Sequence, residues 1–353
     1  MRFLMAGGGT GGHIIPALAV ARELRSRGHE PFFVGTERGL ESKLVPAEGF
    51  ALQKIEIGGL NGVGIRQKFA TAARLPFVTG ECGTCVRDAA AVFSMGGYVA
   101  GPPVLAALLR RIPLVVMEPN AIAGFTNRAI GKMVARALIS FPETARYFRA
   151  GRTELTGLPV RKKFFEIPVK PRGPVLSLLV TGGSQGSRTL NRAVRESWPL
   201  FRAATVPVRI LHQTGPVEYE AIRDEFASAG VEGEVVPFIG DMPAAFEAAD
   251  LVICRSGAGA VSELAAAGRP SVLVPYPFAA DDHQTRNAEA MERAGAARLL
   301  TDARFNGDIL VSTVLELAGT AGLFEQMAGA ARRLARPGAA VRAAEILEEV
   351  ARR

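Results

Sequence analysis

The sequence predicts an α/β protein built from two Rossmann-like domains, each a doubly wound parallel sheet, that face each other across a cleft. Its 353 residues are too many for one ordinary hydrophobic core. Short apolar or β-branched runs alternate with helical patterns, which is typical of parallel sheets covered by helices on both faces. A glycine-rich turn follows the first predicted strand of each half, at residues 7–12 and 182–186.

The first half is taken as an N-terminal domain of residues 1–160, with strands and helices in alternation. Its first helix shows the pattern, because Ala17, Val20, Ala21 and Leu24 form one apolar stripe and Gly28 ends the helix. Strands are expected at Phe3–Ala6, Phe32–Val34, Leu52–Ile57, Ala91–Ser94, Leu114–Met117, Ala137–Ser140 and Thr153–Leu155.

The second half, taken as a C-terminal domain of residues 161–353, repeats this alternation. Strands are expected at Val175–Thr181, Val208–His212, Glu234–Phe238, Leu251–Cys254, Ser271–Val274 and Ala297–Leu300. The proline-rich, basic stretch Thr156–Pro174 is predicted to link the two domains. The alanine-rich end, about residues 323–353, is expected to form a last helix, for which packing back on the N-terminal domain is one open arrangement.

The composition predicts a soluble globular chain, with 48% hydrophobic and 22% charged residues. Three cysteines indicate a reducing compartment without a disulfide framework, and the C-x-x-C of Cys82 and Cys85 is interpreted as two thiols on a helix face. Residues 89–109 are uncharged, but their glycines and prolines favour a strand, a loop and a helix over a membrane span. No signal peptide is expected, because Arg2–Met5 runs directly into the glycine turn.

The formal net charge of +8 is concentrated in the first half of the chain. Residues 1–160 carry 19 Lys and Arg against 11 Asp and Glu, whereas residues 161–353 carry 23 of each. A basic surface attracts anionic lipid, polyanionic substrates or nucleic acid, although a generally arginine-rich composition is an alternative. Nucleic acid is not an expected partner, because the chain has one Trp and four Tyr and no aromatic-basic stacking motif.

The first glycine turn, "GGGTGGH", matches G-x-G-x-x-G through Gly7, Gly9 and Gly12. Its backbone amides and the following helix N-terminus suit a diphosphate. A nicotinamide oxidoreductase with Glu37 as the acid that binds ribose is one interpretation. The second turn, at residues 182–186, favours instead an enzyme whose two halves share one ligand.

The segment Asp250–Pro270 predicts a second phosphate site. A strand ends at Cys254, and small residues begin a helix near Ala258, where the bare amides and the helix dipole favour an anion. Glu263 lies one turn further on, where its carboxylate can accept hydrogen bonds from both hydroxyls of a ribose. The alternative is that Glu263 only stabilises its helix N-terminus.

With these segments assembled, the sequence resembles the peptidoglycan N-acetylglucosaminyl transferase family, MurG, of the GT-B fold. The matching stretches are "GGGTGGHIIPALA", "SMGGYVAGP", "EPNAIAGFTNR", "TGLPVR", "TGGSQGS", "FIGDM", "CRSGAGAVSELAAAGRP" and "DDHQTRNA". The resemblance implies transfer of N-acetylglucosamine from its UDP donor to a muramyl-pentapeptide carried on a polyprenyl diphosphate. It also implies inversion at the anomeric carbon, no metal or other cofactor, and a peripheral location at the inner face of the bacterial membrane.

The resemblance assigns site residues in both halves. On the first domain, Thr10, Gly11, Gly12 and Asn120 would approach the donor, and Gly96, Gly97 and Tyr98 would line the acceptor side. On the second domain, the donor would meet Arg161, Ser184, Ile239, Ala258, Gly259, Ala260, Val261, Ser262, Glu263 and Gln284. In these roles Ser184 and the helix start meet the diphosphate, Ile239 bonds uracil through its backbone, and Glu263 and Gln284 hold ribose and sugar hydroxyls.

His13 is the candidate general base, because it stands at a helix N-terminus, where the dipole favours a neutral imidazole. A histidine that only caps the turn is the structural alternative. Glu118 is the second candidate base, or the group that orients His13. His29 is expected at the surface, and His212 is expected to be structural. No D-x-D motif for a metal occurs in the chain, which favours charge stabilisation by helix amides.

The stretch Gly64–Val78 combines basic and apolar residues, which suits shallow contact with an anionic membrane surface. An ordinary helix packed on the domain is about as consistent with this stretch alone, but the basic excess of the first half favours contact with an anionic inner-membrane surface. A UDP-N-acetylglucosamine 2-epimerase is the alternative function of the same fold class.

Overall fold

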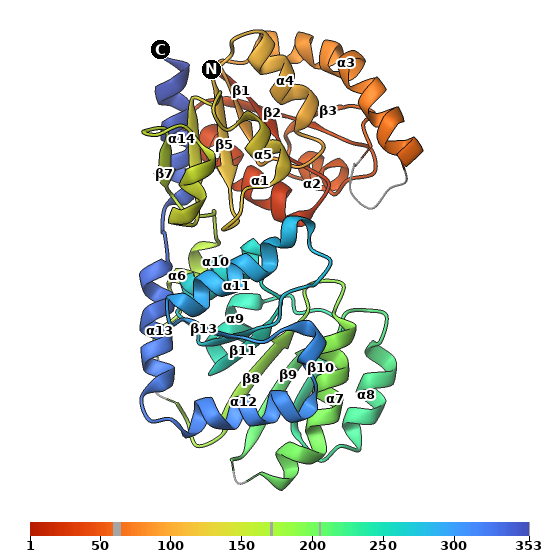
Figure 1. The fold of residues 1–353 in the computed structure, drawn as a ribbon, viewed down its shortest axis with the longest axis vertical. Helices are drawn as coiled ribbons and strands as arrows, with labels where there is room; N and C mark the ends of the chain where they lie inside the picture. Colours follow the sequence, from red (N-terminus) through yellow and green to blue (C-terminus); the bar gives the residue numbers. More distant parts are fainter. Residues whose placement is uncertain (59–64, 170–171, 205, 353) are drawn as a thin grey trace. The chain divides into compact units, whose positions relative to one another are not determined.

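The structure is a computed structural model of the chain, and it describes residues 1–58, 65–169, 172–204 and 206–352, with side chains 65–73 also outside the description. The chain divides into two compact units (Figure 1). Unit 1 contains Met1–Pro159 and Gly338–Arg353, and unit 2 contains Val160–Pro337. Each unit is an independent α/β body with its own parallel sheet.

The described part of unit 1 contains a seven-stranded parallel sheet in the order β3-β2-β1-β4-β5-β6-β7. The strands are β1 (Arg2–Ala6), β2 (Glu30–Gly35), β3 (Ala51–Lys54), β4 (Ala91–Ser94), β5 (Leu114–Glu118), β6 (Arg136–Ile139) and β7 (Thr153–Leu155). The helices are α1 (Gly11–Ser26), α2 (Glu41–Ala47), α3 (Ile65–Arg87), α4 (Gly101–Leu109), α5 (Phe125–Ile130), the 3-10 helix η1 (Pro142–Tyr147) and α14 (Ala339–Ala351).

Unit 2 contains, within its described residues, a six-stranded parallel sheet in the order β10-β9-β8-β11-β12-β13. The strands are β8 (Leu176–Thr181), β9 (Val208–Gln213), β10 (Glu232–Val236), β11 (Leu251–Cys254), β12 (Ser271–Leu273) and β13 (Ala297–Leu299). The helices are α6 (Lys162–Phe165), α7 (Arg188–Ala203), α8 (Tyr219–Ala227), α9 (Met242–Ala248), α10 (Ala258–Ala267), η2 (Ala280–Asp282), α11 (His283–Arg293), η3 (Asp302–Arg304), α12 (Gly307–Gly319) and α13 (Leu323–Leu334).

The predicted fold class is confirmed, and every predicted strand is present with small differences at its ends. The strand expected at Leu52–Ile57 already ends at Lys54, and the one expected at Glu234–Phe238 begins at Glu232. The strand order reverses direction beside β1 in unit 1 and beside β8 in unit 2. In doubly wound sheets such reversals open a crevice at the carboxyl ends of the strands, which is where ligands bind.

The apolar stripe of α1 packs as its spacing predicts. Ala17, Val20, Ala21 and Leu24 are fully buried, and α1 ends at Ser26, just before Gly28. The uncharged stretch 89–109 forms β4, a glycine turn and α4, as predicted. No single helix among the described residues is long and apolar enough to cross a membrane. The segments Gly307–Gly319 and Leu323–Ala351 together have the length and composition of a membrane span, but they are bent by 96° at the break between them.

Part of the predicted linker is instead folded onto unit 2. Residues 162–165 form α6, whose Phe164 is fully buried with its ring edge-on to Phe246 at 5.1 Å between centroids. This burial holds that part of the predicted linker against unit 2. The three cysteines are free and buried.

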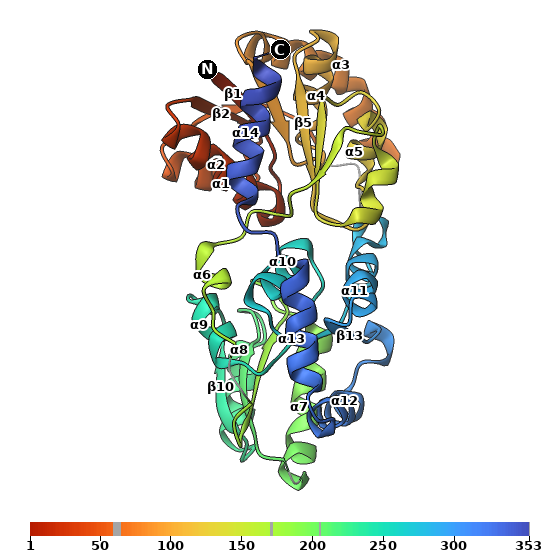
Figure 2. The same cartoon turned by 90° about the vertical axis from the view of Figure 1, so that its left-hand side faces the viewer.

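The expected last helix is two helices, which is a correction to the sequence prediction. Helix α13 belongs to unit 2, whereas α14, beyond Pro337 and Gly338, belongs to unit 1 and packs against α1 and β4 (Figure 2). Proline and glycine both disfavour a continuous helix, which explains the break. The chain therefore passes between the units twice, at residues 159–160 and 337–338.

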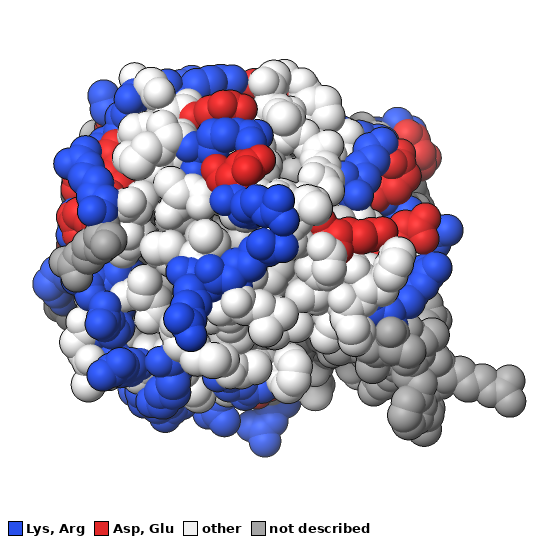
Figure 3. All heavy atoms as spheres, turned by 90° about the horizontal axis from the view of Figure 1, so that it is seen from above, with Lys and Arg blue, Asp and Glu red and all other residues white. Residues whose placement is uncertain are grey.

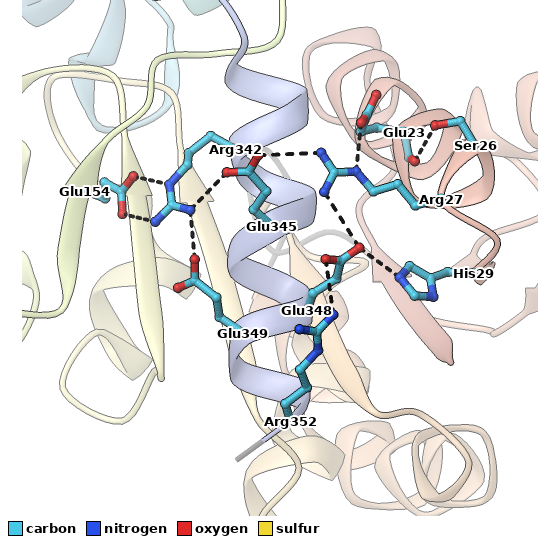
Figure 4. Close-up of polar contacts among 10 residues, drawn as sticks. All are labelled: Glu23, Ser26, Arg27, His29, Glu154, Arg342, Glu345, Glu348, Glu349 and Arg352. Atoms are coloured by element: carbon cyan, nitrogen blue, oxygen red, sulfur yellow. Dashed lines mark hydrogen bonds and ion pairs between the residues drawn. The ribbon is translucent and has the colours of Figure 1, made fainter.

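Charged side chains attach α14 to the rest of unit 1 (Figure 4). Arg342 donates to both carboxylate oxygens of Glu154, at 2.6 and 3.1 Å. His29 Nε2 donates to Glu348 at 2.9 Å, and Arg27 lies 3.7 Å from the same carboxylate. The prediction that His29 is a surface residue is wrong, because its side chain is only 13% exposed. Glu348 and the neighbouring ring of Phe3 cover it.

We expect Glu348→Gln to destabilise the protein at pH 7 by up to about 1 kcal/mol, because it removes the charge that faces His29 and Arg27. The hydrogen bond from His29 lowers the pKa of Glu348. The contribution of ionised Glu348 to the free energy of unfolding is therefore fully present above the pKa of about 4.3 that a glutamate has in the unfolded chain. It is lost as the pH falls through the lower pKa of Glu348 in the folded protein. Thermal melts of both proteins should differ at pH 7 and converge in acid.

The matched control is Glu349→Gln, since Glu349 is more exposed and pairs only with Arg342 among its described contacts. A melting temperature for Glu348→Gln equal to that of the parent at pH 7 contradicts the assigned role.

Candidate active site

The predicted site residues of unit 1 follow strands β1, β4 and β5, at the carboxyl edge of the sheet. Helix α1 begins directly after the glycine turn, with an extended Thr10 before it that makes no side-chain capping bond. The first turn of α1 contains no acidic residue. The amides of Gly11 and Gly12 at this N-terminus therefore suit an anionic group.

The imidazole of His13 is half-buried and lies against the glycine turn. Its Nδ1 is 3.3 Å from the carbonyl oxygen of Gly8 and 3.4 Å from Oγ1 of Thr10. A carbonyl oxygen only accepts, so a hydrogen bond at this contact needs a proton on Nδ1, and in the neutral imidazole the lone pair is then on Nε2. This is the tautomer that a general base at Nε2 needs.

The loop predicted to line the acceptor side packs against the same turn. A Cβ added to Gly97 would lie 3.1 Å from Cε1 and Nδ1 of His13, and the φ of Gly97 is 79°. The ring of Tyr98 lies beside Gly9, 3.0 Å from where a Cβ would stand. Gly97 is thus required both by its backbone conformation and by the approach of His13. The structure brings His13 together with Gly97, one of the residues predicted to line the acceptor side.

Glu118 ends β5 and is almost completely buried. One carboxylate oxygen accepts from the backbone and side-chain amides of Asn120, both at 3.1 Å, and the other accepts from Gly124 N and Asn127 Nδ2, both at 2.9 Å. Burial raises the pKa of Glu118, and these hydrogen bonds oppose the rise. Its described contacts organise the loop that carries Asn120, which favours a positioning role over that of a base.

Glu41 is a residue of this site that the sequence prediction missed. It is the first residue of α2, is fully buried, and accepts a hydrogen bond from the amide of Gly9 at 2.7 Å. Its other oxygen accepts from the amide and hydroxyl of Thr36, both at 2.8 Å. The only signal in the sequence is an acid at a helix start, which is common on surfaces. Glu37, the ribose acid of the oxidoreductase interpretation, is exposed and pairs with Lys54.

The predicted phosphate site of unit 2 lies at the start of α10. Gly257 precedes this helix without a side-chain cap, and its first turn has no acidic residue. A Cβ added to Gly257 or Gly259 would meet nothing within 4 Å, so a ligand has room to approach the amides of Ala258, Gly259 and Ala260. Val261 differs, because its side chain is buried and its amide donates to Gly257. Ser262 is partly buried one residue before Glu263.

Glu263 and Arg161, assigned to the same ligand, lie together in unit 2 with 3.6 Å between Glu263 Oε1 and Arg161 Nη2. Burial raises the pKa of Glu263 to about 7, and the Arg161 guanidinium opposes that rise. Hydrogen bonds donated by a ligand would stabilise the ionised form of such a carboxylate, because burial alone disfavours its charge.

Gln213, at the end of β9, connects two segments that are predicted to contact the nucleotide-sugar donor. Its Nε2 donates to the carbonyl of Gly183, next to the exposed Ser184, at 2.7 Å. Its Oε1 accepts from the amide of Ile239 at 3.3 Å. The sequence prediction missed Gln213, although a polar residue at the carboxyl end of a strand beside a glycine turn is a usable signal.

Gln284, in α11, is held close to the start of α10. Its carbonyl accepts from the buried hydroxyl of Ser256 at 2.8 Å, and its side-chain oxygen accepts from Tyr276 N at 3.0 Å. Ser256 directly precedes Gly257, the residue that opens α10. The contact therefore joins the residue assigned to sugar hydroxyls to the predicted phosphate site.

Arg255 is a second residue that the sequence prediction missed. Its guanidinium donates to Ser187 Oγ at 2.7 Å, to Asp302 at 2.5 Å, and to the carbonyls of Val274 and Pro275, both at 3.0 Å. Ser187 caps α7 at the end of the second glycine turn. Arg255 therefore ties this turn to the carboxyl end of β12.

The stretch predicted to contact a membrane is only partly described. Residue 64 and the side chains of residues 65–73 lie outside the described part of the chain. Within the rest, Phe77 is 71% exposed, Val78 is buried, and Arg74 lies 3.4 Å from Glu56.

Comparison with known proteins identifies the family. Residues 3–139 match the glycosyltransferase family 28 N-terminal domain, and residues 177–343 match its C-terminal domain. The UDP-N-acetylglucosamine--N-acetylmuramyl-(pentapeptide) pyrophosphoryl-undecaprenol N-acetylglucosamine transferase of Solibacter usitatus (strain Ellin6076) is 69% identical over 350 residues, which cover 99% of this chain and 96% of the relative. The chain belongs to the MurG family.

A crystal structure of Acinetobacter baumannii MurG agrees, with 34% identity, a TM-score of 0.82 and 99% of both chains covered. The predicted family and the class of enzyme, a glycosyltransferase, are thus confirmed, and the oxidoreductase interpretation is wrong. A putative UDP-N-acetylglucosamine 2-epimerase from Listeria monocytogenes has a TM-score of 0.68 but only 13% identity over 99% of this chain and 95% of the other. That likeness shows the fold that MurG proteins share with it and does not favour the epimerase alternative.

Proposed function

We propose that this enzyme transfers N-acetylglucosamine from UDP-N-acetylglucosamine to the 4-hydroxyl of undecaprenyl-diphosphate-linked N-acetylmuramyl-pentapeptide, with inversion at the anomeric carbon. The product is the lipid-linked disaccharide precursor of peptidoglycan. The observation that carries the proposal is the 69% identity, over 99% of this chain, to a relative named for this transfer. The predicted site residues of unit 1 and of unit 2 are chemically suited to this transfer.

The donor is assigned to the carboxyl edge of unit 2. The uncapped amides at the start of α10, together with Ser184, suit the diphosphate, since helix amides and their dipole stabilise negative charge. Glu263 accepts the ribose hydroxyls, the backbone of Ile239 meets uracil, and Gln284 donates to sugar hydroxyls. On unit 1, Thr10, Gly11, Gly12 and Asn120 are assigned to the donor as well, and Gly96, Gly97 and Tyr98 to the acceptor.

The chemistry assigned to unit 1 is general base catalysis by His13. Its Nε2 takes the proton of the acceptor hydroxyl while that oxygen bonds to the anomeric carbon. The bond from this carbon to the diphosphate oxygen breaks, and UDP leaves with the electron pair. Helix amides stabilise the charge on the departing UDP, which is the role that a metal ion plays in other transferases.

The lipid-linked acceptor makes a membrane surface the expected partner, and we place the enzyme peripherally on the cytoplasmic face. Unit 1 contains an open hollow lined by Arg111, Lys132, Arg149 and Arg152, with no acidic residue among its lining. Phe77, Leu109 and Met133 are exposed apolar residues of the same unit. Figure 3 shows this unit from above, with Lys and Arg spread over the lower left of the view. Basic side chains beside exposed apolar ones suit anionic lipid headgroups.

The central test is incubation with UDP-N-acetylglucosamine and the lipid-linked muramyl-pentapeptide, with released UDP as the readout. We expect His13→Ala to lower kcat by about 10²–10⁴-fold, the usual contribution of a general base. Affinity for UDP, measured by calorimetry, should stay within about twofold because His13 is not assigned to the nucleotide. Turnover that survives in His13→Ala overturns the assignment of the base.

Donor binding should depend on the ionisation of Glu263. Its pKa of about 7 leaves it partly protonated near neutrality, and only the carboxylate accepts from both ribose hydroxyls. Affinity for UDP-N-acetylglucosamine, whose doubly esterified diphosphate keeps a constant charge in this range, should fall about tenfold from pH 8 to pH 6. Glu263→Gln should bind more weakly and without this slope. An equal slope in both proteins assigns the titration to another group.

Membrane contact should depend on unit 1. We expect Phe77→Ser combined with Arg149→Glu to reduce co-sedimentation with anionic vesicles at least about fivefold, because one basic residue near such a surface contributes about 1 kcal/mol. Val217→Ser is the matched control, since Val217 is an exposed apolar residue of unit 2. Co-sedimentation that ignores both the substitutions and the anionic lipid content contradicts the proposed surface.

A further inference from the structure

We propose that Glu41 is a positioning residue for the base, acting on His13 through the peptide group that joins Gly8 to Gly9. The inference rests on the proposed function, in which His13 takes the proton of the acceptor hydroxyl. The sequence had offered Glu118 as the orienting group, but the described hydrogen bonds of the Glu118 carboxylate go to residues 120–127.

Two hydrogen bonds meet at one peptide group. Glu41 Oε2 accepts from the amide of Gly9 at 2.7 Å, and the carbonyl of Gly8 lies 3.3 Å from Nδ1 of His13. The carbonyl of Gly8 and the amide of Gly9 are the two ends of the same planar, resonance-stabilised unit. The carboxylate and the imidazole therefore act on opposite ends of one dipole.

Such a chain of hydrogen bonds is cooperative. A carboxylate that draws on the N–H of Gly9 increases the negative charge on the carbonyl oxygen of Gly8. That oxygen then becomes a better acceptor for Nδ1–H of His13, which favours the tautomer with its lone pair on Nε2. The same polarisation stabilises the imidazolium that forms when Nε2 takes a proton.

The backbone around Glu41 leaves its carboxylate little freedom. A Cβ added to Gly8 would lie 2.5 Å from Cδ of Glu41, and one added to Gly35 would lie 2.4 Å from Cγ. A Cβ on Gly39 would meet the carboxylate carbon at 2.3 Å. Three glycine backbones thus enclose a side chain that has no exposed surface. A carboxylate enclosed in this way keeps one position, and it can therefore hold the group that it contacts in one geometry.

The hydrogen bonds to Thr36 allow the effect on His13 to be separated from simple stabilisation of the loop. Glu41 Oε1 accepts from the amide and the hydroxyl of Thr36, whereas Oε2 accepts from Gly9. In Glu41→Gln, the side-chain oxygen keeps the two hydrogen bonds from Thr36. The side-chain NH₂ group then faces the N–H of Gly9, and because both groups are donors, the hydrogen bond to Gly9 is lost. Thr36→Val removes one bond to the same carboxylate and leaves the Gly9 bond intact.

The first test compares Glu41→Gln with Thr36→Val in the full chain. We expect Glu41→Gln to lower kcat at least about tenfold, the usual effect of losing a group that orients a functional histidine, with the KM for the UDP sugar within about twofold. Thr36→Val should lower the melting temperature while kcat stays within about twofold. Equal losses of kcat in both variants, or none in Glu41→Gln, overturn the proposal.

A double-mutant cycle separates this inference from the proposed function. If Glu41 acts through His13, Glu41→Gln has no further effect on kcat in a His13→Ala background. A full additional loss in that background overturns the inference and leaves His13 as the base. Unchanged turnover in His13→Ala alone instead contradicts the part of the proposed function that makes His13 the base.

The tautomer of His13 tests the inference in the parent protein, and a variant is needed only to assign the signal. The chain has four histidines, so ¹⁵N spectra of the imidazoles are simple, and loss of one signal in His13→Ala assigns it. We expect Nδ1–H with an unprotonated Nε2 in the parent protein at neutral pH. A proton on Nε2 in place of Nδ1 in the parent protein overturns the inference.

Discussion

The hydrogen bond between the Gly9 amide and the buried carboxylate of Glu41 is the interaction on which the site of unit 1 depends. Thr10 is the only residue of the glycine turn with a side chain, and this side chain does not cap α1, so the helix N-terminus is open toward an anion. An anchor from outside the turn is therefore needed. Glu41 supplies it, and the anchored turn is contacted by His13 at the carbonyl of Gly8 and by Tyr98 beside Gly9.

Unit 2 meets the same constraint with the opposite charge. Its glycine turn is anchored by Arg255, whose guanidinium reaches Ser187 at the end of the turn and is itself paired with Asp302. In both units a largely buried charged side chain from another segment holds a glycine turn for which a phosphate ligand is predicted. Glu41 accepts from the amide of Gly9 and Arg255 donates to the hydroxyl of Ser187, so neither contact occupies the amides at the starts of α1 and α10.

The sequence allowed the strands, the first helix and the surroundings of His13 to be predicted, because short apolar runs and glycine turns are local signals. Glu41 and Arg255 were missed because their burial is decided by segments far away in the chain: 32 residues separate Glu41 from Gly9. By pattern alone, an acid at a helix start and an arginine in a loop are surface residues. His29 was misplaced for the same reason, since the residue that covers it, Glu348, is 319 positions away.

The double passage of the chain between the units has a consequence for biosynthesis. Unit 2 is in effect an insertion within unit 1, because α14 is translated only after all of Val160–Pro337. Until then α1 lacks the helix that packs on it, so the domain that begins first on the ribosome is completed last. A premature stop codon that removes α14 would therefore spare unit 2 and impair unit 1, which carries His13.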